Sequence, residues 1–195
     1  DLERGQLEAL LRRNGLATYG LLNSTERRTT TKVRVMGNNQ HMLRIDNEDK
    51  QPLQDKEKRR LMGVLKSAIK EGVDGIILQD YNKGVFTAEM IREVLELADS
   101  HDIPTFVDPK QENFYAFKGC TVFKPNLREL SDATNRHLHG TDRSAIQEAI
   151  TEVRETMWHK YTFTTLSEHG VILCNQPEQF VHLPAHFRKI PDVSG

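Results

Sequence analysis

The order of the elements predicts an α/β fold with a mostly parallel sheet, helices on both faces of that sheet and a small projecting hairpin. From residue 57 onward, amphipathic segments alternate with short apolar runs, as helices alternate with buried strands in parallel sheets. Residues 28–46 instead alternate apolar and polar side chains around a Gly-Asn-Asn turn, which is typical of a β-hairpin. The length of 195 residues suits a single domain over residues 1–195.

The first half of the chain is expected to contain two helices and the hairpin. Leucines at helical spacing predict a helix over residues 2–14. The alternation over residues 29–46, with its turn at 37–39, predicts a hairpin that has one polar face. Residues 56–71 carry an apolar stripe at helical spacing, and Gly72 is expected to end that helix.

The second half is expected to supply the sheet and the helices that pack on it. Strands are predicted at 75–78, 104–107, 121–123, 161–165, 171–174 and 179–183, and helices from 87, from 126 and from about 141 to 156. The first strand is a continuous apolar run, as in a strand covered on both faces. The last two strands are expected to pair antiparallel at one edge.

Composition narrows the class of protein. Lys and Arg total 27 against 28 Asp and Glu, a formal net charge of -1, which argues against a nucleic-acid binder. No apolar run approaches the roughly 18 residues of a membrane helix. The two cysteines, Cys120 and Cys174, form no CxxC pair. We therefore expect buried thiols in a reducing, cytoplasmic setting, with no nucleic-acid or membrane partner.

Polar residues follow each predicted parallel strand at the point where it ends. The segments are Gln79–Gly84, Asp108–Lys110, Lys124–Asn126 and Thr165–Ser167. In open α/β sheets, ligands bind outside the carboxyl ends of the strands. The sequence therefore predicts a site for a polar, phosphorylated ligand at this edge of the sheet.

Each of these polar residues also has a purely structural interpretation. Asp80 and Asp108 are residues that commonly begin turns. Asn126 and Glu129 stand at the spacing of a helix capping box, with Asn in the place of the usual Ser or Thr. The lysines of these segments are compatible with a solvated surface. The residues alone leave both interpretations open.

Seven segments, in family order, resemble the ribokinase-like (PfkB-type) carbohydrate kinases. They are 29–35 (TTTKVRV), 40–46 (QHMLRID), 79–84 (QDYNKG), 107–110 (VDPK), 124–129 (KPNLRE), 165–170 (TLSEHG) and 192–195 (DVSG). NLRE and DVSG are general to the family. The hairpin, DYNKG and VDPK look most like the branch that phosphorylates D-glycero-D-manno-heptose 7-phosphate at its anomeric hydroxyl, on the ADP-heptose route to lipopolysaccharide.

The resemblance implies ATP and Mg²⁺ as cofactors and a role for each matched residue. Asn126 and Glu129 would support Mg²⁺ and the ATP phosphates, Glu129 through water. The other residues implied in nucleotide or phosphate binding are Lys110, Thr165, Gly170, Ser194 and Gly195. The hairpin matches a lid over the sugar, and the implied sugar-phosphate contacts are Lys32, Arg34, Arg44, Asp80, Lys83 and Asp108.

The resemblance also bears on the two ends of the chain. Asp1 lies inside a helical pattern without an initiator Met, and Gly195 stands in a turn sequence. Both ends are therefore interpreted as truncated, and the chain as the central part of one kinase domain. In the family the catalytic Asp follows DVSG in an Ala-Gly-Asp segment. No catalytic base is then expected in this chain, and we expect it to be inactive alone.

Further expectations and alternatives accompany the kinase assignment. A homodimer is expected, either through an uncovered sheet edge or through the apolar faces of two hairpins. One alternative is a kinase of another sugar, such as ribose, fructose or a hexose phosphate. A second is a non-catalytic α/β binding module. An oxidoreductase of the Rossmann type would need a Gly-rich turn after the first strand, which the sequence lacks.

Overall fold

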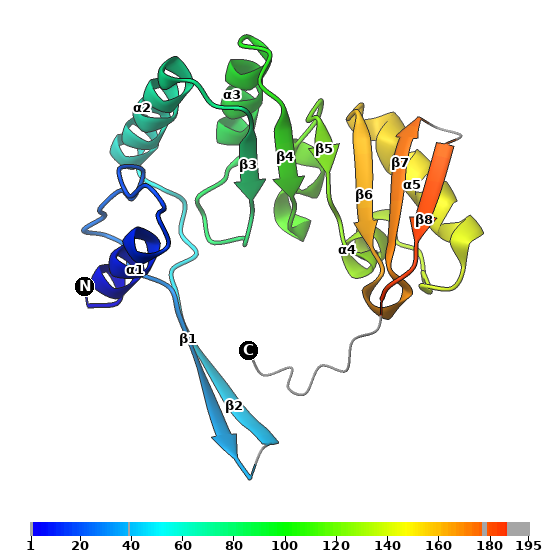
Figure 1. Cartoon of the computed structure of the whole chain (residues 1–195), viewed down its shortest axis with the longest axis horizontal. Coiled ribbons are helices and arrows are strands. Elements are labelled where there is room, and N and C mark those ends of the chain that lie inside the picture. The colour runs from blue at the N-terminus through cyan, green and yellow to red at the C-terminus, as the bar shows by residue number, and fades with distance from the viewer. Residues whose placement is uncertain (1, 39, 177–178, 187–195) are drawn as a thin grey trace. The chain divides into compact units, whose positions relative to one another are not determined.

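A computed structural model describes residues 2–38, 40–176 and 179–186 of the chain (Figure 1). The described residues belong to two compact units, one within residues 1–72 and the other within residues 73–189. The domain boundaries expected from the sequence stay a prediction. Among the described residues, no helix is both long and apolar enough to span a bilayer.

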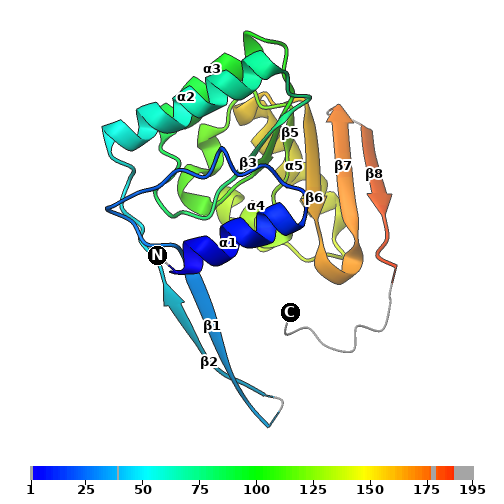
Figure 2. The same cartoon turned by 60° about the vertical axis from the view of Figure 1, so that its left-hand side comes forward.

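The first unit contains the two helices and the hairpin in the predicted order. Helix α1 covers Leu2–Arg13 and α2 covers Asp55–Glu71. Strands β1 (Thr31–Gly37) and β2 (Gln40–Asn47) pair antiparallel as a two-stranded ribbon (Figures 1 and 2). The periodicity of the sequence therefore placed these four elements to within a residue or two.

The hairpin has one apolar and one charged face, as predicted. Val33 lies opposite Ile45, and Lys32 lies opposite Asp46 on the other face. Both faces are solvent-exposed, with Val33 52% and Ile45 51% exposed. The hairpin thus presents an apolar strip to solvent, although β-branched residues of this kind usually pack against a partner.

The second unit is built on a six-stranded sheet with the order β3-β4-β5-β6-β7-β8. The strands are β3 (Ile76–Gln79), β4 (Thr105–Asp108), β5 (Val122–Phe123), β6 (Tyr161–Thr165), β7 (Val171–Gln176) and β8 (Gln179–Leu183). Strands β3 to β6 are parallel, whereas β7 and β8 are antiparallel. Figures 1 and 2 show β6, β7 and β8 side by side at one end of the sheet. The mostly parallel sheet with an antiparallel edge is confirmed.

Three α-helices and two short 3₁₀ helices connect the strands. They are α3 (Ala88–Asp99), η1 (Gln111–Ala116), α4 (Leu127–Thr134), α5 (Arg143–Met157) and η2 (Ser167–His169). The α-helices begin after Thr87, Asn126 and Asp142, whose side chains each accept a backbone N–H of the first turn. The 3₁₀ helices were not predicted, because one or two turns show too little periodicity.

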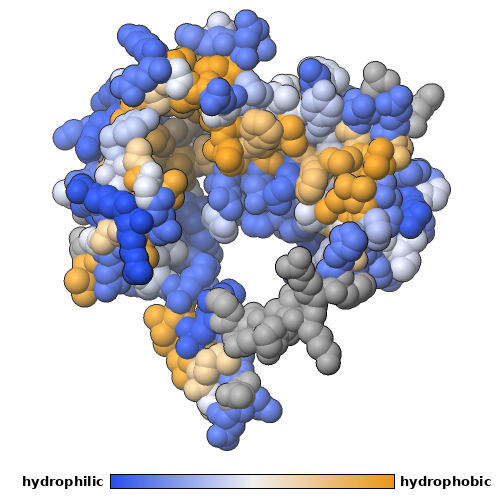
Figure 3. All heavy atoms as spheres, viewed as in Figure 1, coloured by the Kyte–Doolittle hydropathy of each residue, from blue (hydrophilic) through white to orange (hydrophobic). Residues whose placement is uncertain are grey.

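The two faces of the sheet are covered differently. Leu78, Val107 and Phe123 are buried on the face that packs against α3, α4 and α5, which lie behind the sheet in Figure 1. On the opposite face, Ile77 is 76% and Phe106 40% exposed. Figure 3 shows apolar side chains on this face. The expectation that β3 is covered on both faces stays a prediction.

Both cysteines are buried thiols. Cys120 and Cys174 are 0% and 1% exposed, respectively, and neither forms a disulfide. Burial raises the pKa of the Cys120 thiol to about 12. This thiol is therefore protonated at neutral pH and unreactive in the folded chain, and the expectation of free, buried thiols is confirmed.

One buried histidine gives a pH prediction. His159 is 3% exposed and packs on the Phe123 ring, and its Nε2 lies 2.6 Å from Thr162 Oγ1. Burial, together with the nearby Arg154 charge, lowers the pKa of His159 to about 4. In the unfolded chain, His159 binds a proton near pH 6.5. The contribution of the buried, neutral ring to the free energy of unfolding is therefore complete above that pH. It is lost as the pH falls to about 4, at an expected cost of about 3 kcal/mol in the free energy of unfolding.

Urea unfolding at a series of pH values measures this contribution. We expect His159→Gln to be less sensitive than the parent to acidification between pH 6.5 and 4. The matched control is His41→Gln, since His41 lies exposed on the hairpin and should leave the profile unchanged. Equal pH dependence of the parent and His159→Gln would contradict the prediction.

Candidate active site

The carboxyl ends of the four parallel strands meet at one edge of the sheet. The backbone N–H of Asp80 donates to the Asp108 carbonyl at 3.0 Å, which joins the ends of β3 and β4. Asn126, which follows β5, forms a parallel bridge with Thr165, the last residue of β6. The structure thus brings Asp80, Asp108, Asn126 and Thr165 to one edge. Their roles in binding stay predictions.

Lys110 and Glu129 form an ion pair at this edge. The Lys110 Nζ donates to Glu129 Oε1, and Glu129 is only 8% exposed. This hydrogen bond, with the charges of Glu129 and Asp108, raises the pKa of Lys110 although partial burial opposes the shift. Lys110 is therefore a fixed cation at neutral pH.

The same glutamate takes part in a helix capping box. Asn126 Oδ1 accepts the Glu129 N–H at 2.8 Å, and Glu129 Oε2 accepts the Asn126 N–H at 3.0 Å. The capping interpretation of these residues is confirmed. It does not compete with a binding role, because the box holds the carboxylate of Glu129 in one position while its other oxygen contacts Lys110.

A second ion pair lies beside the first. Lys124 Nζ is 3.0 Å from Asp108 Oδ1, and the Lys124 side chain is 38% exposed. We call Asp108, Lys110, Lys124, Asn126 and Glu129 the strand-end cluster. Lys124 was not predicted as a site residue, although its place directly after a buried strand and before Asn126 was the available signal.

Asp80 is buried in its own turn, and the hydrogen bonds of its side chain go to residues outside the strand-end cluster. It is 3% exposed, and its carboxylate accepts the Asn82 backbone N–H at 2.8 Å and the Asn113 Nδ2 at 2.8 Å. This is the turn interpretation that the sequence left open. Lys83 lies half-buried in the same loop.

The loop from Thr165 to Gly170 connects β6 to β7 next to helix α4. Thr165 N–H donates to the Pro125 carbonyl at 3.2 Å, and Leu166 N–H donates to the Gly170 carbonyl at 2.8 Å. Gly170 has φ 89° and ψ −135°, a conformation that favours glycine. A Cβ at this position would collide with the Leu183 carbonyl oxygen of the chain leaving β8.

The basic residues expected to bind the sugar phosphate lie on the hairpin, in the other compact unit. Lys32 Nζ is 3.7 Å from Asp46 Oδ2 and 3.9 Å from Glu48 Oε2. Arg44 Nε is 3.0 Å from Asp46 Oδ1. Arg34 lies opposite Arg44 in the register and is exposed. The hairpin therefore concentrates cationic groups, partly neutralised, on its charged face.

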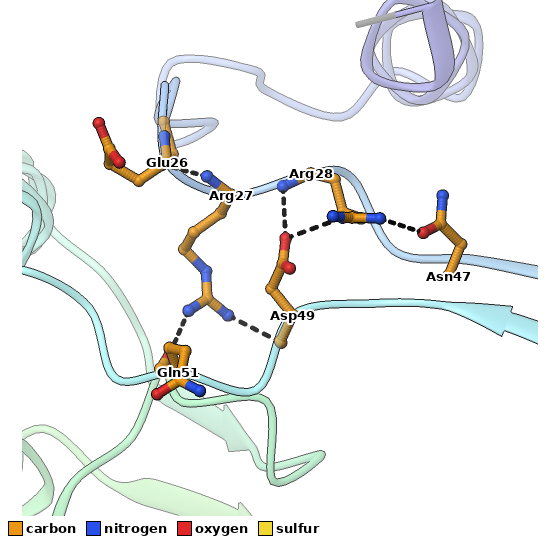
Figure 4. Close-up of polar contacts among 7 residues, drawn as sticks. Glu26, Arg27, Arg28, Asn47, Asp49 and Gln51 are labelled. Carbon is orange, nitrogen blue, oxygen red and sulfur yellow. Dashed lines mark hydrogen bonds and ion pairs between the residues drawn. The ribbon is translucent and has the colours of Figure 1, made fainter.

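The base of the hairpin is closed by an arginine cluster that the sequence analysis did not predict (Figure 4). Arg28 donates from its backbone N–H and its Nε to Asp49 Oδ2 at 2.8 and 3.3 Å, and from Nη1 to Asn47 Oδ1 at 2.6 Å. Arg27 donates to the carbonyls of Gln51 and Asp49. Hydrogen bonds from Arg28 and the charges of both arginines lower the pKa of Asp49. These contacts join the entering and leaving strands.

Two expected phosphate-binding residues, Ser194 and Gly195, lie outside the described residues. Among residues 2–38, 40–176 and 179–186, no group of three or more His, Cys, Asp or Glu side chains is placed to hold a metal. Mg²⁺ commonly uses one or two carboxylates with waters and substrate phosphates. The strand-end cluster, with Glu129 and Asp108, fits that pattern.

Comparison with known proteins places the chain in a family. Residues 1–195 match the profile described as "pfkB family carbohydrate kinase". The chain belongs to the PfkB family of carbohydrate kinases. Similar curated proteins are the "Bifunctional protein HldE" of Helicobacter pylori strain G27, 32% identical over 195 residues, and that of Pelobacter propionicus, 36% identical over 197. Each covers 100% of this chain, which spans only 41% and 40% of their lengths.

Solved structures of PfkB-type kinases share the fold. Phosphofructokinase-2 from Escherichia coli, solved with potassium, has a TM-score of 0.73 at 18% identity, over 92% of this chain and 57% of its own. Ribokinase from Arabidopsis thaliana, solved with ribose and ATP, has a TM-score of 0.55 at 16% identity, over 81% and 49%. The ribokinase-like fold expected from the sequence is confirmed, and the family match decides against a Rossmann oxidoreductase.

Proposed function

We propose that the protein carrying this PfkB chain transfers the γ-phosphoryl group of ATP to the anomeric hydroxyl of D-glycero-D-manno-heptose 7-phosphate, in the cytoplasmic supply of ADP-heptose. The observation that carries the proposal is the match to bifunctional HldE proteins over the whole chain at 32–36% identity. The segments DYNKG and VDPK support it, because they resemble the heptose branch of the family.

The strand-end cluster supplies groups suited to a nucleotide's phosphates. Lys110 and Lys124 are cations held by carboxylates at the edge where ligands bind in such sheets. Phosphoryl transfer is catalysed mainly by positioning and by stabilising charge on the transferred group. We assign Lys110 and Lys124 to phosphate oxygens, and the Thr165–Gly170 loop to the side of the nucleotide.

Glu129, with Asp108 beside it, would hold Mg²⁺ through water. Mg²⁺ would neutralise charge on the ATP phosphates when bound. The part played by this chain is to keep the Glu129 carboxylate fixed between the Asn126 N–H and the Lys110 ammonium. The sugar oxygen attacks the γ-phosphorus as the bond to the β-phosphate oxygen breaks, and the general base that the resemblance implies lies outside the described residues.

The hairpin is assigned to the sugar phosphate and to a dimer contact. Arginine binds phosphate through two parallel hydrogen bonds, so Arg34 and Arg44 on the charged face are suited to the 7-phosphate. The apolar face, with Val33 and Ile45 about half exposed, is suited to the same face of a second copy. The homodimer belongs to this proposal and is checked by light scattering of the purified protein.

The proposal is tested with protein expressed from the complete reading frame. ADP release is measured with ATP and Mg²⁺ against heptose 7-phosphate, the same heptose without its phosphate, fructose 6-phosphate and ribose. We expect the highest kcat/KM for heptose 7-phosphate. A preference for fructose 6-phosphate or ribose would support another sugar kinase. Failure to bind MgATP in isothermal titration would support a non-catalytic module.

A further inference from the structure

The side chains of Asp80, which is buried, and Asn113, which is half-buried, join three segments next to the strand-end cluster. Asp80, at the end of β3, accepts hydrogen bonds on both carboxylate oxygens, from the Asn82 backbone and from Asn113 Nδ2. Asn113 Nδ2 also lies 3.3 Å from the Phe86 carbonyl. The side chain of Asn113 therefore holds both ends of the loop over residues 80–86.

Asn113 is also hydrogen-bonded to the backbone of Lys110, one of the two lysines of the strand-end cluster. It lies in η1, which begins immediately after Lys110, and its backbone N–H donates to the Lys110 carbonyl at 3.2 Å. The backbone N–H of Asp80 donates to the Asp108 carbonyl. The pair is thus bonded directly to the backbone on either side of Pro109, between the two charged residues Asp108 and Lys110.

We infer that Asp80 and Asn113 are positioning residues, which set the backbone of Lys110 so that its ammonium meets Glu129 and the phosphates, and that neither touches substrate. This inference rests on the proposed function. Asp80 would have to break two hydrogen bonds and leave a 3% exposed position to reach a ligand, and an unsatisfied buried group is costly. The resemblance implied that Asp80 contacts the substrate. In this proposal Asp80 instead affects nucleotide binding by positioning Lys110.

The position of Asn82 supports a locked loop. Asn82 has φ 52°, in the left-handed region, and its N–H is the group that Asp80 accepts. Asn tolerates this region better than most residues, but the conformation still needs support from its surroundings. The carboxylate of Asp80 provides that support by accepting the Asn82 N–H.

The experiment measures MgATP affinity by isothermal titration, and kcat and KM for ATP and sugar phosphate, for protein from the complete reading frame. We expect Asn113→Ala and Asp80→Ala each to weaken MgATP binding by about tenfold, the loss typical of one hydrogen bond. The KM for the sugar phosphate should stay within twofold. If Asp80→Ala does not fold, Asp80→Asn serves, since it keeps an acceptor for Asn82 but not for Asn113.

The decisive measurement is a double variant. If Asn113 acts through Lys110, adding Asn113→Ala to Lys110→Met should weaken MgATP binding by less than twofold beyond Lys110→Met alone. A general loss of structure would instead give additive effects and overturn the proposal. A raised sugar-phosphate KM in Asp80→Ala with no effect of Asn113→Ala would overturn it too, in favour of substrate contact.

The control is Thr87→Ala, which removes the cap of α3 in the same part of the chain. It should lower stability to a similar degree without changing MgATP affinity. Nucleotide binding is measured without sugar. If the variants change MgATP affinity as expected but the protein does not turn over heptose 7-phosphate, the result counts against the proposed substrate and not against the positioning pair.

Discussion

Replacing Glu129 with glutamine is expected to lower kcat/KM for ATP by roughly 10²-fold, the scale seen when one charge-stabilising group is removed from a catalytic site, while α4 stays capped. The amide oxygen of glutamine can still accept the Asn126 N–H, so the capping box survives. What is lost is the negative charge beside Lys110 and Asp108. A group that only capped the helix would tolerate this exchange.

Steady-state kinetics and urea unfolding together separate the two roles of Glu129. Glu129→Ala should lose both the activity and about 1 kcal/mol of stability, the usual cost of a lost cap. Asp142→Ala is the matched control, because Asp142 caps α5 in the same way through the Ala145 N–H. It should lose similar stability and keep full activity. Normal turnover by Glu129→Gln would remove Glu129 from the proposed phosphate site.

The sequence predicted the elements better than the contacts between them. Periodicity located the helices and the strands, since burial of one face at a period of 3.6 or 2 is a local property. The capping box was visible for the same reason: Asn126 and Glu129 are three residues apart. The carboxyl-end rule placed Asp108 and Asn126 at one edge because it needs only parallel strands.

Pairing between distant residues could not be predicted in this way. Lys110 meets Glu129, and Lys124 meets Asp108, so each cation contacts the carboxylate of a different segment. Which lysine meets which acid depends on the register of β4 against β5 and on the turn into η1. The burial of Asp80 depends on Asn113, 33 residues away. A resemblance of motifs carries no information about such partners.

The exposed faces show a second limit of sequence reasoning. Ile77 and Phe106 are apolar but 76% and 40% exposed, whereas the polar Thr162 and Thr164 are buried. Residue type predicts average burial, and the structure decides which face of each strand packs against helices. The hairpin differs, since both its apolar strip and the exposure of that strip were expected from the sequence and are observed.

Gly170→Ala is expected to destabilise the chain by roughly 2–6 kcal/mol, because two independent costs act at one position. The backbone conformation, with φ 89° and ψ −135°, strains any residue that has a Cβ. The new methyl group would also collide with the Leu183 carbonyl oxygen and crowd the backbone of Pro184 and Ala185. Backbone atoms cannot move away as the end of a side chain can, so the loop itself must shift.

Gly119→Ala separates these two costs. Gly119 has φ +78°, and an added Cβ there meets nothing within 4 Å, so this variant carries the strain of a positive φ without the collision. In urea unfolding, Gly170→Ala should therefore lose clearly more stability than Gly119→Ala. Gly170→Ala should also weaken MgATP binding, since the shifted loop carries Thr165 away from Asn126 and Pro125. Equal losses in the two variants would mean that β8 yields to the new methyl group, and the Thr165–Gly170 loop would then be less rigidly held than its contacts indicate.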